Sequence, residues 1–482
     1  MPTSWPRDYT ELRPLLLRGE VSCVQVVEDC LSRIGQSRLN AFITVFGEQA
    51  LRRARVVDRH LAKGKAGALA GLAVGIKDNI HVRGWPTTCG SRHLRAFVAP
   101  FSATVVSRLL RSGAIVVGKT NMDEFGMGSS GESSCHGPTR NPHDLGRVPG
   151  GSSSGSAAAV AGGEVWAALG SDTGGSVRQP ASFCGLVGLK PTYGRVSRYG
   201  LVAFGSSLDQ IGPLTRSVND CALLLQVIAG YDRRDATSAR VPPGSWLDEL
   251  QKGVRGLRIG RPAEYFRPPL DSEVAAAVDR MLNELCAQGA SVVEMSLPHT
   301  RYAVAAYYVT CTAEACSNLS RFDGLRFGER VAGVGLEETY AMSRSAGFGP
   351  EVQRRIMLGS FVLSAGHYKA YYDKAQRVRS LLREEFAQAF RKVDCVVTPT
   401  SPTTAFGLGE RTQDPLTMYM SDVYTVSPSL CGLPAISVPC GKDRNGLPIG
   451  LQVTGRYFDE ATLLRVARTV ELTAGQLFAH GQ

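Results

Sequence analysis

Apolar residues recur at helical spacing through the first 65 positions, and short apolar runs then take their place. Residues 8–65 are therefore predicted to be helical, and Ser22 can cap one of these helices. The runs at 72–76 and 114–117 predict buried strands, with a helix at 104–110 between them. Strands that alternate with helices favour an α/β core built on a central sheet.

Later segments continue this alternation. Asn445-Gly446 lies between two apolar runs and is typical of a hairpin turn. No internal repeat is visible in the chain. The pattern predicts five further elements, which are helices at 272–290, 351–390 and 459–472 and strands at 393–398 and 434–439.

Residues 128–215 are rich in glycine and serine, but apolar blocks interrupt them, so they are not a flexible linker. Glycine at this density indicates crowded turns or backbone that lies close to a ligand. No boundary clearly splits the chain. We therefore expect a single domain over residues 1–482, with a helical part at 1–65 and helical additions at about 250–390.

Composition adds little to this picture. Apolar residues make up 43% and charged residues 20%, which is typical of a folded soluble protein and excludes disorder of the whole chain. The formal net charge of +11 would favour a position near RNA. Because the Lys and Arg residues are spread out, a solvated surface is the preferred interpretation, and direct RNA binding is the alternative.

The compartment can also be inferred. No run of about 18 apolar residues predicts a membrane span. Residues 1–8 lack the basic start and apolar core of a signal peptide, so we expect a cytoplasmic protein. None of the twelve cysteines falls in a C-x-x-C pair or has zinc spacing, which predicts reduced, mostly apolar fillers.

Two ligand-binding motifs fail when their context is considered. Residues 113–120 match the phosphate loop G-x-x-x-x-G-K-T. Their interior is β-branched and apolar, so the strand lies inside the motif rather than before it, which argues against ATP binding by this chain. His136, His143 and Asp144 share a loop, but their spacing fits no standard metal site, and we expect no metal.

A third motif, Gly151–Gly155, matches the nucleophile elbow G-x-S-x-G and would make Ser153 the nucleophile. An elbow follows a buried strand, whereas residues 141–150 are polar and contain proline. A Ser-His-Asp hydrolase would also need a downstream histidine. No candidate for it has a distinctive setting; they are His299, His367 and His480.

Three polar segments remain. Lys77 directly follows an apolar strand, and residues 150–156 and 170–180 form glycine- and serine-rich turns, the second at the end of an apolar run. Ligands of open α/β sheets bind at such strand ends. A serine nucleophile needs a base, and a lysine can serve only when it is neutral. Neutrality at pH 7 costs about 4.6 kcal/mol for an ordinary lysine, and burial can supply that shift.

Thr173, Gly174, Gly175 and Ser176 could turn several backbone N–H groups toward one point. Such a cluster stabilises the oxyanion of a tetrahedral intermediate. Each segment by itself could equally be a tight turn, and Lys77 alone could be a surface residue. From spacing alone, catalysis is one interpretation among these.

The three segments, in this order, closely resemble the amidase signature family over nearly the whole chain. The resemblance implies an α/β fold with a large central mixed β-sheet covered by helices on both faces. It also implies a catalytic triad in which Ser176 attacks an amide, Ser152, on a cis peptide, relays the proton, and Lys77 is the base. Ser154 departs from the usual pattern G-G-S-S-G-G-S, and a positive φ there would destabilise a serine.

One branch of this family is similar in further motifs, namely residues 118–125, 190–197 and 207–213. It comprises the A subunits of the glutamyl-tRNA(Gln)/aspartyl-tRNA(Asn) amidotransferases. That resemblance implies a glutaminase that supplies ammonia for amidating mischarged tRNA, as one part of a heterotrimer with the B and C subunits. ATP and magnesium are used by the B subunit, so no cofactor is expected on this chain.

The same resemblance implies that Arg355 and Asp422 bind glutamine, within a pocket to which the region at about 250–390 contributes. An arginine suits the α-carboxylate and an aspartate the α-ammonium, and Arg354 is the rival of Arg355. Two other functions stay open. One is a stand-alone amidase acting on another small amide, and the other is an inactive scaffold or RNA-binding subunit.

Overall fold

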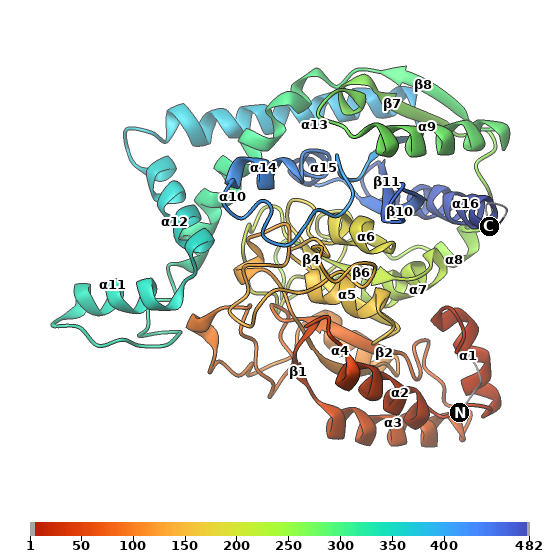
Figure 1. Cartoon of the computed structure of the whole chain (residues 1–482), viewed down its shortest axis with the longest axis horizontal. Helices are drawn as coiled ribbons and strands as arrows, with labels where there is room; N and C mark the ends of the chain where they lie inside the picture. The colour runs from red at the N-terminus through yellow and green to blue at the C-terminus, as the bar shows by residue number, and fades with distance from the viewer. Residues whose placement is uncertain (1–4, 480–482) are drawn as a thin grey trace.

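The computed structural model describes residues 5–479, so His480 and the first four residues of the chain lie outside it. Its centre is one mixed sheet with the strand order β1-β3-β2-β4-β6-β5-β10-β11-β9-β7-β8 (Figure 1). The strands are β1 (Phe42–Val45), β2 (Ala73–Lys77), β3 (Ile115–Thr120), β4 (Ala167–Asp172), β5 (Val187–Lys190), β6 (Gln210–Thr215), β7 (Arg258–Pro262), β8 (Ser291–Met295), β9 (Cys395–Pro399), β10 (Ala435–Lys442) and β11 (Pro448–Gly455).

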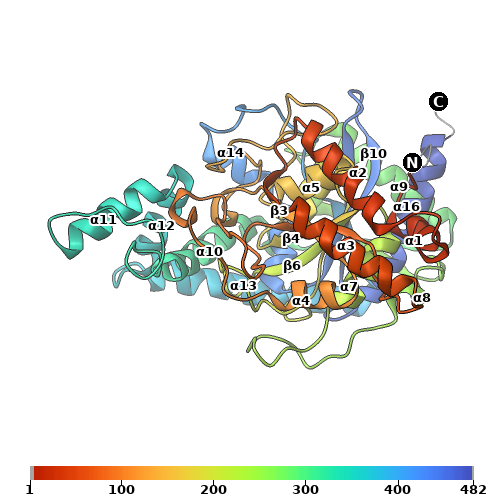
Figure 2. The ribbon, with the colours of Figure 1, turned by 90° about the horizontal axis from the view of Figure 1, so that it is seen from below.

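Helices cover this sheet on both faces. The two helices α6 and α16 pack against the same strands, β10 and β11, from opposite sides, with α5 beside α6 and α9 beside α16 (Figures 1 and 2). The helices are α1 (Tyr9–Arg18), α2 (Cys23–Gln36), α3 (Gly47–Leu61), α4 (Thr104–Arg111), α5 (Ser154–Ala161), α6 (Arg178–Cys184), α7 (Val218–Ile228), α8 (Trp246–Glu249), α9 (Ser272–Ala287), α10 (Ala303–Leu319), α11 (Leu336–Gly347), α12 (Pro350–Leu363), α13 (Lys374–Lys392), α14 (Pro415–Met420), α15 (Val426–Cys431) and α16 (Glu460–Ala479). The predicted α/β class and mixed sheet are confirmed.

The strands that carry the site run parallel. Strand β2 pairs in parallel with both β3 and β4, so the carboxyl ends of these strands meet at one edge. Every residue of β2 is buried, which explains its continuous apolar run. Lys77 is the last residue of β2, and the turn that contains Ser176 follows β4. Two segments that lie about 100 residues apart therefore converge.

A predicted helix cap, a predicted helix and a predicted hairpin are confirmed. Ser22 caps α2 in a capping box, since its hydroxyl accepts the Gln25 N–H at 3.1 Å and the Gln25 side chain accepts the Ser22 N–H at 2.9 Å. The helix predicted at 104–110 is α4, and the hairpin at Asn445-Gly446 joins β10 to β11.

Other regions differ from the prediction. The helical part at 1–65 contains the edge strand β1, and the region at about 250–390 contributes β7 and β8 to the far edge of the sheet. The helix predicted at 351–390 is two helices, α12 and α13, separated by a turn and a short π-helix. Residues 322–363, which we call the arm, carry α11 and α12, and α11 extends away from the body (Figure 1).

The motif at 113–120 contains strand β3, as predicted, and does not curl as a phosphate loop. Lys119 lies buried on this strand and pairs with Asp78 at 2.8 Å. Among residues 5–479, no helix is long and apolar enough to cross a membrane. All twelve cysteines are free thiols, as predicted.

Candidate active site

Lys77 is fully buried at the carboxyl end of β2. Its ammonium nitrogen Nζ lies 2.7 Å from the Ser152 hydroxyl, 3.0 Å from the Ser153 hydroxyl and 3.3 Å from the Ser171 carbonyl oxygen. Burial lowers the pKa of Lys77 from its ordinary value of 10.5 to about 7, although nearby aspartates oppose this shift. A lysine with such a pKa can accept a proton near neutral pH.

The loop before α5 presents Ser152 to this lysine. The Gly151–Ser152 peptide bond is cis, as the family resemblance implied. The Gln179 side chain holds the loop, because its Oε1 accepts the Gly151 N–H at 3.0 Å and its Nε2 donates to the Ser129 carbonyl at 2.9 Å. Ser154 is the first residue of α5, and its φ is not positive, so the expected destabilisation does not arise.

Ser153 does not occupy a nucleophile elbow. No strand precedes it, its side chain is fully buried, and its hydroxyl donates to the Ser171 carbonyl at 3.2 Å. Its backbone N–H donates to the Ser176 carbonyl at 3.1 Å and so joins the two glycine-rich segments. His299 pairs with Glu385 at 2.5 Å, far along the chain from any candidate serine.

Ser176 lies in the turn between β4 and α6 and is 8% exposed. An ion pair closes this turn. Arg178 donates to both oxygens of Asp172 at 2.9 Å, and the Val177 N–H donates to the same carboxylate at 3.2 Å. Within residues 5–479, no hydrogen bond joins the Ser176 hydroxyl to Ser152, so the relay to Ser176 stays a prediction.

Positions 174 and 175 must be glycine, because neighbouring side chains lie too close to leave room for a Cβ. A Cβ at Gly174 would lie 2.5 Å from the ring of Tyr307, and a Cβ at Gly175 would lie 2.3 Å from Oγ1 of Thr425. The Thr425 hydroxyl also donates to the Gly174 carbonyl at 2.6 Å. Any side chain would therefore push this backbone away from its neighbours, which fits a surface that a substrate must reach.

Arg355 is buried on α12, whereas Arg354 is 42% exposed, which favours Arg355 as the substrate-binding residue. Arg355 donates through Nε to Glu351 at 2.7 Å, and its guanidinium lies 5.1 and 5.3 Å from the stacked rings of Tyr308 and Tyr419. In the described part of the chain, its two Nη groups have no hydrogen-bond acceptor. They are available for a carboxylate.

Asp422 is buried beside Gly175, since a Cβ at Gly175 would lie 3.2 Å from its Oδ1. Its Oδ2 accepts a hydrogen bond from Ser129, while Oδ1 has no partner among the described residues. Burial raises the pKa of Asp422 to about 7, and Arg355 opposes this increase. An unpartnered buried carboxylate oxygen is a natural site for a cationic group.

Some residues of the site were missed from the sequence. Asp172 and Arg178 bracket Ser176 with opposite charges, a signal that is present within residues 170–180. Glu351 lies four residues before Arg355, the spacing of a helical ion pair. Tyr419 donates to the same Glu351 oxygen at 2.7 Å, and no sequence signal connects these two segments.

No group of three or more metal-binding side chains occurs in residues 5–479. His136 lies 3.3 Å from the Thr88 hydroxyl, and His143 lies 3.0 Å from the Cys184 carbonyl. These histidines make different local contacts, and the absence of a metal at this loop stays a prediction.

Two solved structures resemble this chain over nearly its whole length. The A subunit of glutamyl-tRNA(Gln) amidotransferase from Thermotoga maritima superposes with a TM-score of 0.78 at 44% identity, over 93% of both chains. A peptide amidase from Stenotrophomonas maltophilia superposes with a TM-score of 0.82 at 31% identity, over 97% of both chains. The fold is therefore that of the amidases.

The family model named Amidase matches residues 25–464, and the chain belongs to this family. Two relatives are the A subunits of glutamyl-tRNA(Gln) amidotransferases. The protein from Thermodesulfovibrio yellowstonii is 54% identical over 96% of both chains. The protein from Moorella thermoacetica is 56% identical over 96% of this chain and 95% of its own.

Proposed function

We propose that this chain is the glutaminase subunit of a tRNA-dependent amidotransferase. It would hydrolyse glutamine through an acyl-enzyme on Ser176 and release ammonia for the amidation of Glu-tRNA(Gln) or Asp-tRNA(Asn). The observation that carries the proposal is a buried lysine of lowered pKa together with a buried arginine, Arg355, and a buried aspartate, Asp422, that lies beside the glycine turn. The names of the relatives support it.

In the proposed reaction, neutral Lys77 takes a proton from Ser152, which takes one from Ser176. The Ser176 oxygen attacks the side-chain amide of glutamine, and the oxyanion forms beside the backbone of Thr173, Gly174 and Gly175. Lys77 and Ser152 then pass a proton to the amide nitrogen, which leaves as ammonia. Water attacks the ester, Ser152 and Lys77 take up its proton and return one to the Ser176 oxygen, and glutamate is released.

Arg355 and Asp422 would select glutamine among amides. The Nη groups of Arg355 match the α-carboxylate in a bidentate geometry, and Asp422 Oδ1 accepts from the α-ammonium. A bound ammonium next to Asp422 would lower the raised pKa of this carboxyl again. An amide that lacks either charged group would leave one of these buried ions unpaired.

The partners follow from the same proposal. The B subunit would receive the ammonia and use ATP and magnesium to amidate the mischarged tRNA, and the C subunit would complete the heterotrimer. This chain would bind neither ATP nor metal, and the complex would work in the cytoplasm. Its net charge of +11 would favour the approach of tRNA.

Ammonia release from glutamine tests the proposal. Ser176→Ala and Lys77→Ala should abolish it, whereas Arg355→Ala and Asp422→Ala should raise the KM for glutamine at least tenfold. Arg354→Ala is the matched control, because Arg354 pairs with the same Glu351 from the surface and should change KM little.

Two outcomes would contradict the proposal. If Arg355→Ala and Asp422→Ala turn over glutamine like the parent, a stand-alone amidase acting on another amide is the better account. If Ser176→Ala and Lys77→Ala release ammonia as fast as the parent, the chain is not the catalyst. Steeply salt-dependent binding of tRNA by this chain alone would then favour the scaffold function.

A further inference from the structure

Glu124 joins the body of the protein to the arm. It lies just after β3, is 3% exposed, and uses one carboxylate oxygen on each side. The Ser91 hydroxyl of the body donates to Oε1 at 2.5 Å, and the Gly349 N–H of the arm donates to Oε2 at 2.8 Å. The proposed catalytic steps do not use this buried carboxylate.

On the arm, the carboxylate meets the start of α12. Gly349 precedes the helix and has no side chain to cap it, and Pro350 has no N–H. Glu124 therefore satisfies a backbone donor that the helix cannot satisfy itself, at the end where the helix dipole favours negative charge. The approach is close, because a Cβ at Gly349 would lie 2.4 Å from the carboxylate.

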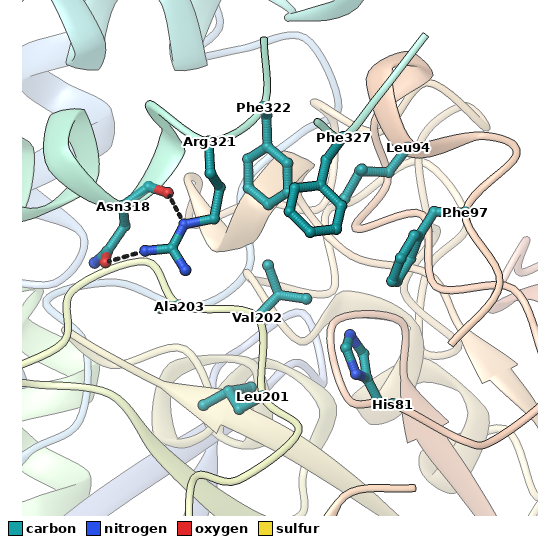
Figure 3. A pocket seen from close by; sticks show the side chains of 10 residues that line it. All are labelled: His81, Leu94, Phe97, Leu201, Val202, Ala203, Asn318, Arg321, Phe322 and Phe327. Carbon is teal, nitrogen blue, oxygen red and sulfur yellow. Dashed lines mark hydrogen bonds between the residues drawn. The ribbon is translucent and has the colours of Figure 1, made fainter. Parts of the chain in front are cut away.

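A pocket lies at the base of the arm. Phe322 and Phe327 of the arm face Leu94 and Phe97 of the body around a pocket of about 210 Å³ (Figure 3). Beyond this pocket the arm is open to solvent, and Val334 is 97% exposed. Farther along, α12 packs against α10, so the bond from Glu124 acts on the start of this helix in particular.

We propose that Glu124 is a positioning residue. It fixes the start of α12 so that Arg355 meets the α-carboxylate of glutamine. The inference rests on the proposed function. Arg355 lies six residues after Gly349, about 9 Å along the helix. Loss of the anchor would shift Arg355, whereas Lys77 ends the buried strand β2 and Ser176 follows the buried strand β4, so both would stay in place. Binding of glutamine should therefore suffer more than the chemical step.

The test measures kcat and KM for glutamine with the full chain in its complex. Glu124→Ala should raise KM about tenfold and change kcat less than threefold. Glu124→Gln keeps an acceptor for the Gly349 N–H and should restore KM to within threefold of the parent. Asp220→Ala is the matched control, because Asp220 is also a buried carboxylate that caps a helix start, at the N–H groups of Tyr9 and Thr10.

An unchanged KM in Glu124→Ala, whatever its kcat, or an equal rise of KM in Asp220→Ala, would overturn the inference. If Glu124→Ala fails to fold, Ser91→Ala replaces it; it removes the bond from the body to Glu124 together with the longer contacts of the Ser91 hydroxyl to the Gly347 carbonyl and the His93 N–H. Its KM should rise at least threefold, and an unchanged KM would again overturn the inference. A parent that releases no ammonia from glutamine would instead overturn the proposed function, so the two failures are distinct.

Discussion

Replacing Lys77 with methionine should stabilise the protein at neutral pH while it abolishes activity. The folded pKa of Lys77 is about 7, against an ordinary value of 10.5 in the unfolded chain. Between these values the unfolded chain binds one more proton than the folded one, so the stability of the parent rises with pH by about 1.4 kcal/mol per unit. Below pH 7 both states are protonated, and this dependence ends.

The magnitude follows from the same two values. At pH 7 the lysine destabilises the fold by about 4 kcal/mol relative to pH above 10.5. Lys77→Met removes this destabilisation. It also removes the hydrogen bonds of Nζ to Ser152 and Ser153, whose loss costs about 2 kcal/mol of stability. The variant should therefore be more stable at pH 7, and its advantage should shrink by about 2 kcal/mol between pH 7 and pH 9.

The assay is equilibrium urea unfolding of parent and variant at several pH values, followed by tryptophan fluorescence. Other titrating groups are common to both proteins and cancel in the difference. Lys63→Met, at an exposed position, is the control and should show a difference that does not depend on pH. A flat difference for Lys77→Met as well would show that Lys77 stays charged in the folded protein, and it would refute its assignment as the base.

Three further predictions concern the same site. The kcat/KM for glutamine should rise with pH through about 7, as Lys77 loses its proton, and plots of ammonia release against pH will show this. Gly174→Ala should lower kcat/KM at least about 100-fold, because its Cβ would meet Tyr307. Asp172→Asn should destabilise the fold by about 3 kcal/mol in urea unfolding, because it leaves the buried Arg178 without its counter-ion.

Each of these predictions has a contradicting result. A rate that is constant from pH 5 to pH 9 would exclude a base with this pKa. Wild-type kinetics in Gly174→Ala would mean that the backbone there is not close to the reacting amide. A stability of Asp172→Asn equal to that of the parent would show that Arg178 is held by its other acceptors, Thr425 and Gln452.

The apolar strands could be predicted because their runs are continuous, as in β2 and β3. Strands β6 and β7 were missed because glycine or proline interrupts each of them after a single apolar residue, and β5 has only four residues. The edge strand β8 has only five residues, and its apolar residues do not alternate with polar ones, so it does not stand out. Their place in the sheet depends on tertiary pairing, which the local pattern does not contain.

The candidate site, like the fold, could be predicted only in part from the sequence. Spacing placed Lys77 and the turn of Ser176 at strand ends, but the order of attack and relay came from the family resemblance. The choice of Arg355 over Arg354 depends on which side of α12 is buried against α10 and the 415–422 segment. The role of Glu124 at the start of α12 could not be foreseen, because residues 124 and 349 meet only in the folded chain.

The most direct test of the central claim is to trap the covalent intermediate. The complex is mixed with glutamine, quenched in acid within a turnover, digested and analysed by mass spectrometry. The account predicts a glutamyl ester on Ser176, and no ester in Ser176→Ala or in Lys77→Met. An ester on Ser152 or Ser153, or full turnover by the Ser176→Ala protein, would contradict it.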